Sequence, residues 1–119
     1  MAKLLLIEDN DAVRLSFKLT LELCGHEMIA IDHPDGFEAY LDDIDLVLTD
    51  YTLPGLSGEQ VAEMTRAKSP ETPVIVITGN AENRDAFKAN LIAKGAADVI
   101  FKPADTEFIN GAIEACLAG

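Results

Sequence analysis

Short apolar runs alternate along this chain with longer segments that have the period of a helix. The runs do not alternate between polar and apolar residues, which is typical of strands buried on both faces of a parallel sheet. The five runs are Leu4–Ile7, Met28–Ile31, Leu46–Leu48, Val74–Ile77 and Val99–Phe101. The segments between them supply the helical crossovers that parallel strands require. We therefore expect an α/β fold in which strand and helix alternate five times.

The first two helical segments have recognisable ends. The first begins at Asp11, which we expect to be its N-cap, and stops at Gly25, a glycine in the position just after a helix. The second is short, and Pro34 can occupy its first position because proline has no N–H to leave unpaired there.

The other three helical segments are also marked by capping residues. Ser57 followed by Gln60 is a capping-box signature for the third helix. Asn80 can cap the fourth, which ends at Gly95, and Asp105 can cap the fifth. Each helix thus has a start signal close after the preceding apolar run, which supports the fivefold alternation.

Length and charge limit the functions open to the chain. Its 119 residues match one domain, and we treat residues 1–119 as a single unit. With 9 Lys and Arg against 21 Asp and Glu, the formal net charge is −12. Such a surface repels phosphate backbones and anionic lipids, so we expect neither nucleic-acid nor membrane binding. An anionic substrate would need local charge inversion, for which a divalent cation is the natural agent.

The cysteines and histidines are not arranged as metal or catalytic motifs. Cys24 and Cys116 have no CxxC spacing, and we expect both to be small apolar residues of helix faces in a reduced, cytoplasmic protein. His26 follows a turn glycine and His33 precedes a proline. We expect both histidines to be solvated loop residues. No apolar run is long enough for a signal peptide or a membrane span.

Chemically useful side chains follow four of the expected strands. Ligands bind at the carboxyl ends of parallel strands, near the switch in strand order. Glu8 and Asp9 follow the first run, Asp50 the third, Thr78 the fourth and Lys102 the fifth. If the strand order is 2-1-3-4-5, the three carboxylates converge and require a cation or protons to relieve their repulsion. Oxygen ligands of this kind suit Mg²⁺, and the hydroxyl and ammonium groups suit phosphoryl oxygens.

Each of these residues alone has a simpler interpretation. A carboxylate after a strand most often forms a turn or caps a helix, and Lys102 alone would be a solvated charge. Together, however, the five residues follow the first, third, fourth and fifth strands in turn, and chance is the weaker explanation of that pattern. The acidic turn also excludes two rival sites, because neither GxGxxG nor GxxxxGK[ST] follows the first strand.

The chain resembles the receiver domain of two-component response regulators over essentially its whole length. The motifs that carry the resemblance are Leu4-Leu5-Leu6-Ile7-Glu8-Asp9, Leu48-Thr49-Asp50-Tyr51-Thr52-Leu53-Pro54-Gly55-Leu56-Ser57-Gly58, Val76-Ile77-Thr78-Gly79 and Lys102-Pro103. The resemblance implies a flavodoxin-like (βα)5 three-layer sandwich, whose parallel five-stranded sheet has the order 2-1-3-4-5; a member of this family is a standard example of that order.

The resemblance also implies roles for the site residues. Asp50 would accept a phosphoryl group from a phosphohistidine of a partner. Glu8 and Asp9, with Asp50 and the backbone carbonyl of Thr52, would hold Mg²⁺, for which Mn²⁺ can substitute. Such a domain is a signalling phospho-acceptor that promotes its own phosphorylation and slow dephosphorylation, and is not otherwise an enzyme.

The remaining implied features concern signalling. Thr78 would bond the phosphoryl group and shift with it, and Lys102 would pair with Asp50 and then with the phosphoryl group. The Lys102–Pro103 peptide would be cis. The partner would be a sensor histidine kinase or a histidine phosphotransfer protein. A homodimer would form through the face made by the fourth helix, the fifth strand and the fifth helix, which is also the face that switches.

One departure from the family concerns the switch. The family usually has Tyr or Phe three positions before the lysine, where this chain has Val99. Phe101 lies two positions later and so faces the same side of its strand. Because valine is short and stiff, we expect the signal to be read mainly through Thr78 and the fourth helix.

Three other functions are less consistent with the sequence. A receiver fold that binds a partner without phosphorylation is opposed by the intact set of site residues. A phosphatase of the haloacid-dehalogenase type requires Asp-x-Asp after its first core strand, whereas Asp50 follows the third and has Thr52 two positions later. A helical histidine phosphotransfer protein does not fit the alternation of strands and helices. Phosphorylation by a small acyl-phosphate donor separates these alternatives.

Overall fold

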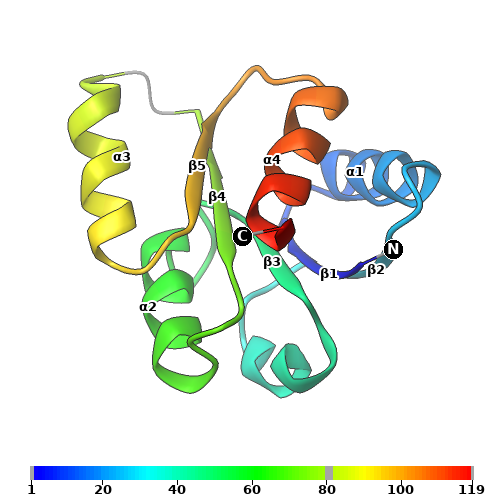
Figure 1. The fold of residues 1–119 in the computed structure, drawn as a ribbon, viewed down its shortest axis with the longest axis horizontal. Helices are drawn as coiled ribbons and strands as arrows, with labels where there is room; N and C mark the ends of the chain where they lie inside the picture. The colour runs from blue at the N-terminus through cyan, green and yellow to red at the C-terminus, as the bar shows by residue number, and fades with distance from the viewer. Residues whose placement is uncertain (1, 80–81, 119) are drawn as a thin grey trace.

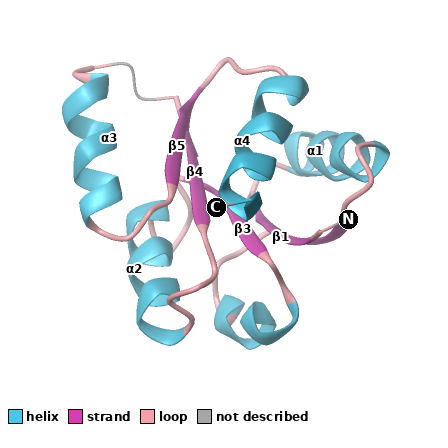
Figure 2. Ribbon diagram, viewed as in Figure 1, coloured by secondary structure: helices cyan, strands magenta, loops and turns pink. Residues whose placement is uncertain are grey.

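The computed structural model describes residues 2–79 and 82–118 and has the expected alternation of strands and helices (Figures 1 and 2). The strands are β1 (Lys3–Ile7), β2 (Glu27–Ile31), β3 (Leu46–Asp50), β4 (Val74–Thr78) and β5 (Asp98–Phe101). The helices are α1 (Asp11–Leu23), the 3-10 helix η1 (Phe37–Asp43), α2 (Gly58–Lys68), α3 (Arg84–Ala93) and α4 (Thr106–Ala118).

The five strands form one parallel sheet of order β2-β1-β3-β4-β5, which confirms the predicted order. β1 pairs with β2 on one side and with β3 on the other, so Ile7 lies opposite both Ile31 and Thr49. The strand order reverses at β1, so the carboxyl ends of β1 and β3 meet at the switch point of the sheet.

Helices cover both faces of the sheet, and each face has its own apolar core. η1, α2 and α3 pack on one face against residues such as Leu5 and Val76. α1 and α4 pack on the other face against residues such as Leu6 and Ile75. Successive residues of one strand therefore enter opposite cores, and both sets are almost fully buried. This is why the strands read as continuous apolar runs in the sequence.

Several predicted helix ends are confirmed. The Ser57 side chain accepts a hydrogen bond from the Gln60 N–H, and the Gln60 side chain accepts one from the Ser57 N–H, which completes the capping box. Asp105 Oδ1 accepts from the Phe108 N–H at 2.8 Å. Gly25 and Gly95 follow α1 and α3 with φ of 97° and 121°, the left-handed conformation that glycine adopts without strain.

Three other predicted helix starts differ. α1 is capped by Asn10, whose Oδ1 accepts from the Val13 N–H at 3.0 Å, and Asp11 is its first helical residue. The short helix is a 3-10 helix that begins after Gly36, so Pro34 precedes it. Asn80 lies outside the described residues, and the residue before α3 is Asn83. Only at α1 does a neighbouring side chain replace the predicted cap, since neither Gly36 nor Asn83 makes a side-chain capping bond.

His26 lies in the loop between α1 and β2, as predicted, but the prediction that it is solvated was wrong. Its side chain is buried, with 8% of the residue exposed, and its Nε2 lies 2.6 Å from Oδ1 of Asn110 on α4. The amide provides the polar partner that sequence proximity could not reveal. His33 is a partly exposed loop residue, as predicted.

The two cysteines have different environments. Cys24 caps the end of α1 and is exposed, so the prediction that it lies in an apolar helix face was wrong. Cys116 is half-buried against the core under α4, as predicted. No helix within the described ranges is both long enough and apolar enough to cross a membrane.

The first residue of α2 packs directly on the end of β3. A Cβ atom on Gly58 would lie 2.8 Å from the Asp50 carbonyl oxygen and 2.9 Å from the Tyr51 Cα, and the Gly58 N–H donates to the Tyr51 carbonyl at 2.7 Å. Only glycine permits this approach. Around Gly111, in the middle of α4, there is open space for a Cβ.

We expect opposite effects from two glycine-to-alanine substitutions. Gly58→Ala should lower the free energy of unfolding by about 1–3 kcal/mol, because the added methyl group meets backbone atoms that cannot move away cheaply. Gly111→Ala should raise it by about 0.5–1 kcal/mol, because alanine favours the helix. Urea unfolding followed by circular dichroism measures both, and a Gly58→Ala protein as stable as the wild type would contradict the packing.

Candidate functional site

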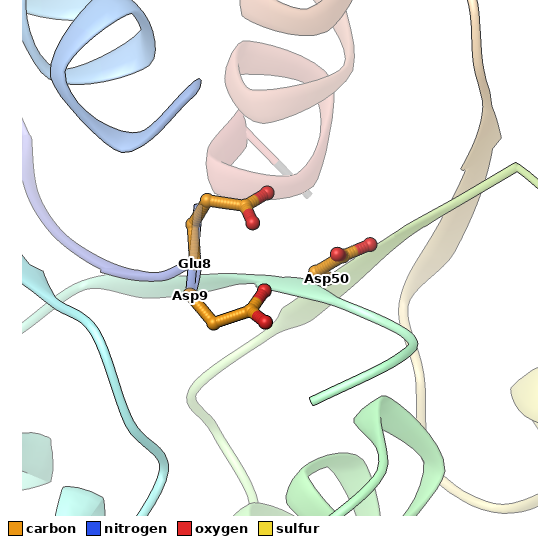
Figure 3. Close-up of side chains that lie close together, drawn as sticks. All are labelled: Glu8, Asp9 and Asp50. Carbon is orange, nitrogen blue, oxygen red and sulfur yellow. The ribbon is translucent and has the colours of Figure 1, made fainter. Parts of the chain in front are cut away.

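The carboxyl edge of the sheet brings together the acidic residues that the sequence singled out. Glu8 and Asp9 follow β1 directly, and Asp50 is the last residue of β3. Because β1 and β3 are neighbours, the three side chains lie close together at the edge of the sheet, with those of Glu8 and Asp9 extending toward Asp50 (Figure 3). One carboxylate oxygen from each lies within 4.8 Å of the others.

The three carboxylates differ in exposure. Glu8 is buried, with 3% of the residue exposed. Asp9 is exposed, and the side chain of Asp50 lies between these extremes at 13% exposed. The site therefore has a buried base and one open side, from which a ligand reaches Asp50 and Asp9.

The Lys102 ammonium and the end of β4 lie on the other side of Asp50. Lys102, just after β5, places its Nζ 3.5 Å from Oδ1 of Asp50. Its backbone N–H donates to the carbonyl of Thr78 at 2.8 Å, which joins the ends of β5 and β4. Thr78 is buried at the end of β4, and the Lys102–Pro103 peptide is cis, as expected. The structure thus brings all five predicted side chains to one edge of the sheet.

Burial sets the protonation preference of two of the carboxyl groups. Desolvation raises the pKa of Glu8 above its usual value, against a hydrogen bond from the Asn10 N–H, and the charge of Asp50 raises it further. Desolvation also raises the pKa of Asp50, although Lys102 and the Tyr51 N–H favour its charged form. The folded protein therefore carries these charges at a cost, which a bound cation would remove.

Sequence reasoning missed Arg14 on α1. Its Nη1 donates to the Glu8 carbonyl at 3.0 Å, and its Nη2 donates to Oδ1 of Asp11 at 2.6 Å. The guanidinium therefore holds the acidic turn to the first turns of α1. The available signal was the three-residue spacing from Asp11, which places the two side chains on one helix face.

The three carboxylates could hold a divalent cation such as Mg²⁺. Hard carboxylate oxygens, few in number and open to water on one side, suit this ion, which keeps several waters in its coordination sphere. The backbone carbonyl of Thr52, an exposed residue two positions after Asp50, is the fourth oxygen that the resemblance implies.

Val99 and Phe101 pack against the same core face, as predicted from their spacing.

Comparison with known proteins gives one consistent result. Residues 4–114 match the sequence model of the response regulator receiver domain. Response regulator protein FleR of Pseudomonas aeruginosa is 36% identical over 104 residues, which make up 86% of this chain and 22% of FleR. Protein PilH of the same species is 32% identical over an alignment of 123 positions, which covers 100% of both chains.

The fold gives the same result. A crystal structure of a response regulator receiver domain protein from Clostridium thermocellum matches 99% of this chain and 95% of its own, with a TM-score of 0.89 and 25% identity. In length, this chain corresponds to about a fifth of FleR and to the whole of PilH.

The raised pKa values predict a dependence of stability on pH in metal-free protein. Because the folded state holds protons on Glu8 and Asp50 more tightly than the unfolded state does, lowering the pH through their raised pKa values should increase the free energy of unfolding. At neutral pH, Asp50→Asn should be more stable than the wild type and should lose part of this dependence. Urea unfolding at several pH values in a chelator, with exposed Asp42→Asn as the matched charge control, measures both; equal curves for the two variants would refute the argument.

Proposed function

The chain belongs to the family of response regulator receiver domains, and we propose on this basis that residues 1–119 form a phosphoryl-accepting signalling domain whose acceptor is Asp50. The observation that carries this proposal is the meeting of Glu8, Asp9 and Asp50 within 4.8 Å, with the Lys102 ammonium 3.5 Å from Asp50. A nucleophilic carboxylate with cationic and metal-binding groups around it suits phosphoryl transfer, which depends on positioning and charge neutralisation.

In the proposed reaction, a carboxylate oxygen of Asp50 attacks the phosphorus of a phosphohistidine. The phosphorus–nitrogen bond breaks, the imidazole leaves with the electron pair, and an acyl phosphate remains on Asp50. Lys102 holds the carboxylate in its charged form beforehand and then pairs with the phosphoryl oxygens. The Thr78 hydroxyl, at the end of the adjacent strand, bonds another of these oxygens. In this proposal the domain promotes its own phosphorylation and slow dephosphorylation and is not otherwise an enzyme.

Glu8, Asp9, Asp50 and the Thr52 carbonyl would hold Mg²⁺ or Mn²⁺, which would supply positive charge beside the transferring group. The donor set supports this assignment, because the three carboxylates repel one another without a cation and burial disfavours two of their charges. Glu8, buried at the base, would orient the site, whereas exposed Asp9 would make the more accessible contact.

The partner that we propose is a sensor histidine kinase or a histidine phosphotransfer protein. FleR is a response regulator, and the proposal extends the chemistry of that class to this chain. An apolar row on α1 supports contact with a protein beside the site. Leu15, Leu19 and Leu23 follow one another at four-residue spacing and are 56%, 51% and 87% exposed. α1 begins two residues after Asp9, so a protein covering this row also reaches toward Asp50.

The alternative function is a receiver fold that binds its partner without being phosphorylated. No particular side chain favours it, since each acidic residue that phosphorylation requires is present at the site. The two functions differ in a direct test, because only a phospho-acceptor forms a covalent acyl phosphate.

We expect a small donor such as acetyl phosphate to add one phosphoryl group to the wild-type protein in the presence of Mg²⁺ and none in a chelator. Asp50→Asn should take up none, because the attacking carboxylate is gone. Asp9→Asn should need about tenfold more Mg²⁺, because one of the few charged ligands is lost. Intact-protein mass spectrometry measures the labelling.

Asp45→Asn is the matched control, since Asp45 precedes β3 at the opposite edge of the sheet and should be labelled normally. Equal labelling of wild type and Asp50→Asn would show that the acceptor is another residue. Absence of labelling in all variants, together with normal partner binding, would favour the alternative function.

We also propose that a second copy of this chain binds the face formed by α3, β5 and α4. This face has a hollow of about 440 Å³ lined by Phe101, Phe108, Arg84 and Lys88 among others, and Phe108 is 62% exposed. We expect phosphorylated protein to approach the dimer mass in light scattering, and Phe108→Glu to remain monomeric. Leu23→Glu on α1 is the exposed-leucine control; dimers formed equally by the Phe108→Glu variant would refute this surface.

A further inference from the structure

Three aromatic rings form a continuous row from the candidate acceptor to the α3–β5 face. The rings of Tyr51 and Phe87 meet edge-on, with centroids 5.0 Å apart at 70°. The Phe87 and Phe101 rings are 6.2 Å apart and tilted by 54°. The Arg84 guanidinium carbon lies 4.9 Å from the Phe101 centroid. All three rings are partly buried and pack on the core that α3 covers.

At one end, the row is tied to Asp50 through a single peptide group. The Tyr51 N–H donates to Oδ1 of Asp50 at 3.0 Å and to the Ile77 carbonyl at 2.8 Å. The Tyr51 carbonyl accepts from the Gly58 N–H at 2.7 Å, so its backbone is held on both sides. A displacement of the Asp50 carboxylate therefore acts directly on Tyr51, whose ring contacts Phe87.

At the other end, the row is tied to Lys102. Phe101 directly precedes Lys102, whose ammonium lies 3.5 Å from the same Asp50 oxygen. Phe101 also lies opposite Thr78 in the β4–β5 register. The acceptor and its lysine thus each have a ring-bearing neighbour in sequence, and both of these rings contact Phe87. Phe87 on α3 thus links two routes from Asp50. One runs through Tyr51 and the other through Lys102 and Phe101.

We propose that Phe87 is a positioning residue, which keeps Asp50 and Lys102 in register for phosphoryl transfer and passes their displacement to α3. This inference rests on the proposed function. The row connects the site to the α3–β5 face without an aromatic side chain at position 99, where this chain has valine. Coupling between two sites is reciprocal, so a change at Phe87 must also alter how strongly the site is loaded.

The amino end of α3 contacts this row through Arg84 and Phe87. Asn83, the residue before the helix, is left-handed at φ 46° and makes no side-chain capping bond. Arg84 is the first helical residue, where a cation faces the positive end of the helix dipole. Its contact with Phe101 compensates in part for that unfavourable position. The first turn of α3 thus contacts the ring row and has no side-chain cap from Asn83, so we expect it to move with the rings.

The test uses the tyrosine beside the acceptor as its probe. The chain has two tyrosines and no tryptophan, so Tyr40→Phe leaves Tyr51 as the main fluorophore. In this background we expect Mg²⁺ with beryllofluoride, a phosphoryl mimic, to change Tyr51 emission and to shift the Arg84 side-chain NMR signal. Phe87→Leu should reduce the Arg84 shift about threefold or more and weaken beryllofluoride loading about two- to tenfold, the range set by one ring–ring contact.

Two variants separate positioning from general loosening of α3. Leu91→Val on the same helix removes fully buried apolar volume from the same core, and it should leave the Arg84 response intact. Phe87→Tyr restores a ring, and its rate of labelling by acetyl phosphate should return to within about twofold of the wild-type rate.

The outcomes distinguish this inference from the proposed function. If Phe87→Leu loads and responds at Arg84 as the wild type does, or if Leu91→Val loses the response equally, Phe87 is not a positioning residue although Asp50 remains the acceptor. If the wild type neither loads beryllofluoride nor is labelled at Asp50, the proposed function fails and this inference fails with it.

Discussion

The placement of three carboxylates at one edge of the sheet is the constraint on which the site depends. The switch in strand order puts Glu8 and Asp9 beside Asp50, and the helices on both faces bury the base of the cluster. Burial and mutual repulsion raise the pKa of Glu8 and of Asp50, while Lys102 offsets part of the cost. Folding stability is therefore reduced at the edge of the sheet where we propose that a cation and a phosphoryl group bind, which is a common relation between stability and function.

The sequence was sufficient for the sheet and for the main side chains of the site. Doubly buried strands produce unbroken apolar runs, and parallel strands send their carboxyl ends to one edge, so residues directly after each run could be placed together. The strand order itself came from family resemblance, because periodicity does not reveal which strands are neighbours. The roles of Asp50, Thr78 and Lys102 stay predictions that labelling experiments decide.

What the sequence could not reveal depends on contacts between distant residues or on choices between adjacent ones. His26 reads as a loop residue because its partner Asn110 is 84 positions away. Asn10 and Asp11 are both good capping residues, and only the backbone path selects the first. The aromatic row joins three separate segments through Tyr51, Phe87 and Phe101. Its contacts are set by the tertiary fold, so neither spacing nor composition could predict them.

The two helices on the α2–α3 side of the sheet differ in how they are fixed. α2 starts against the end of β3, where Gly58 admits no larger residue, so it is a rigid wall of the site. The carboxyl end of α3 is fastened to α2 by Arg66, which donates to the Ala93 carbonyl, and by Asn90, which donates to Glu59. Its amino end has no side-chain cap from Asn83. α3 is thus joined to α2 at its carboxyl end, whereas at its amino end Arg84 contacts the Phe101 ring of β5, so a displacement of that ring would tilt the helix about its carboxyl end.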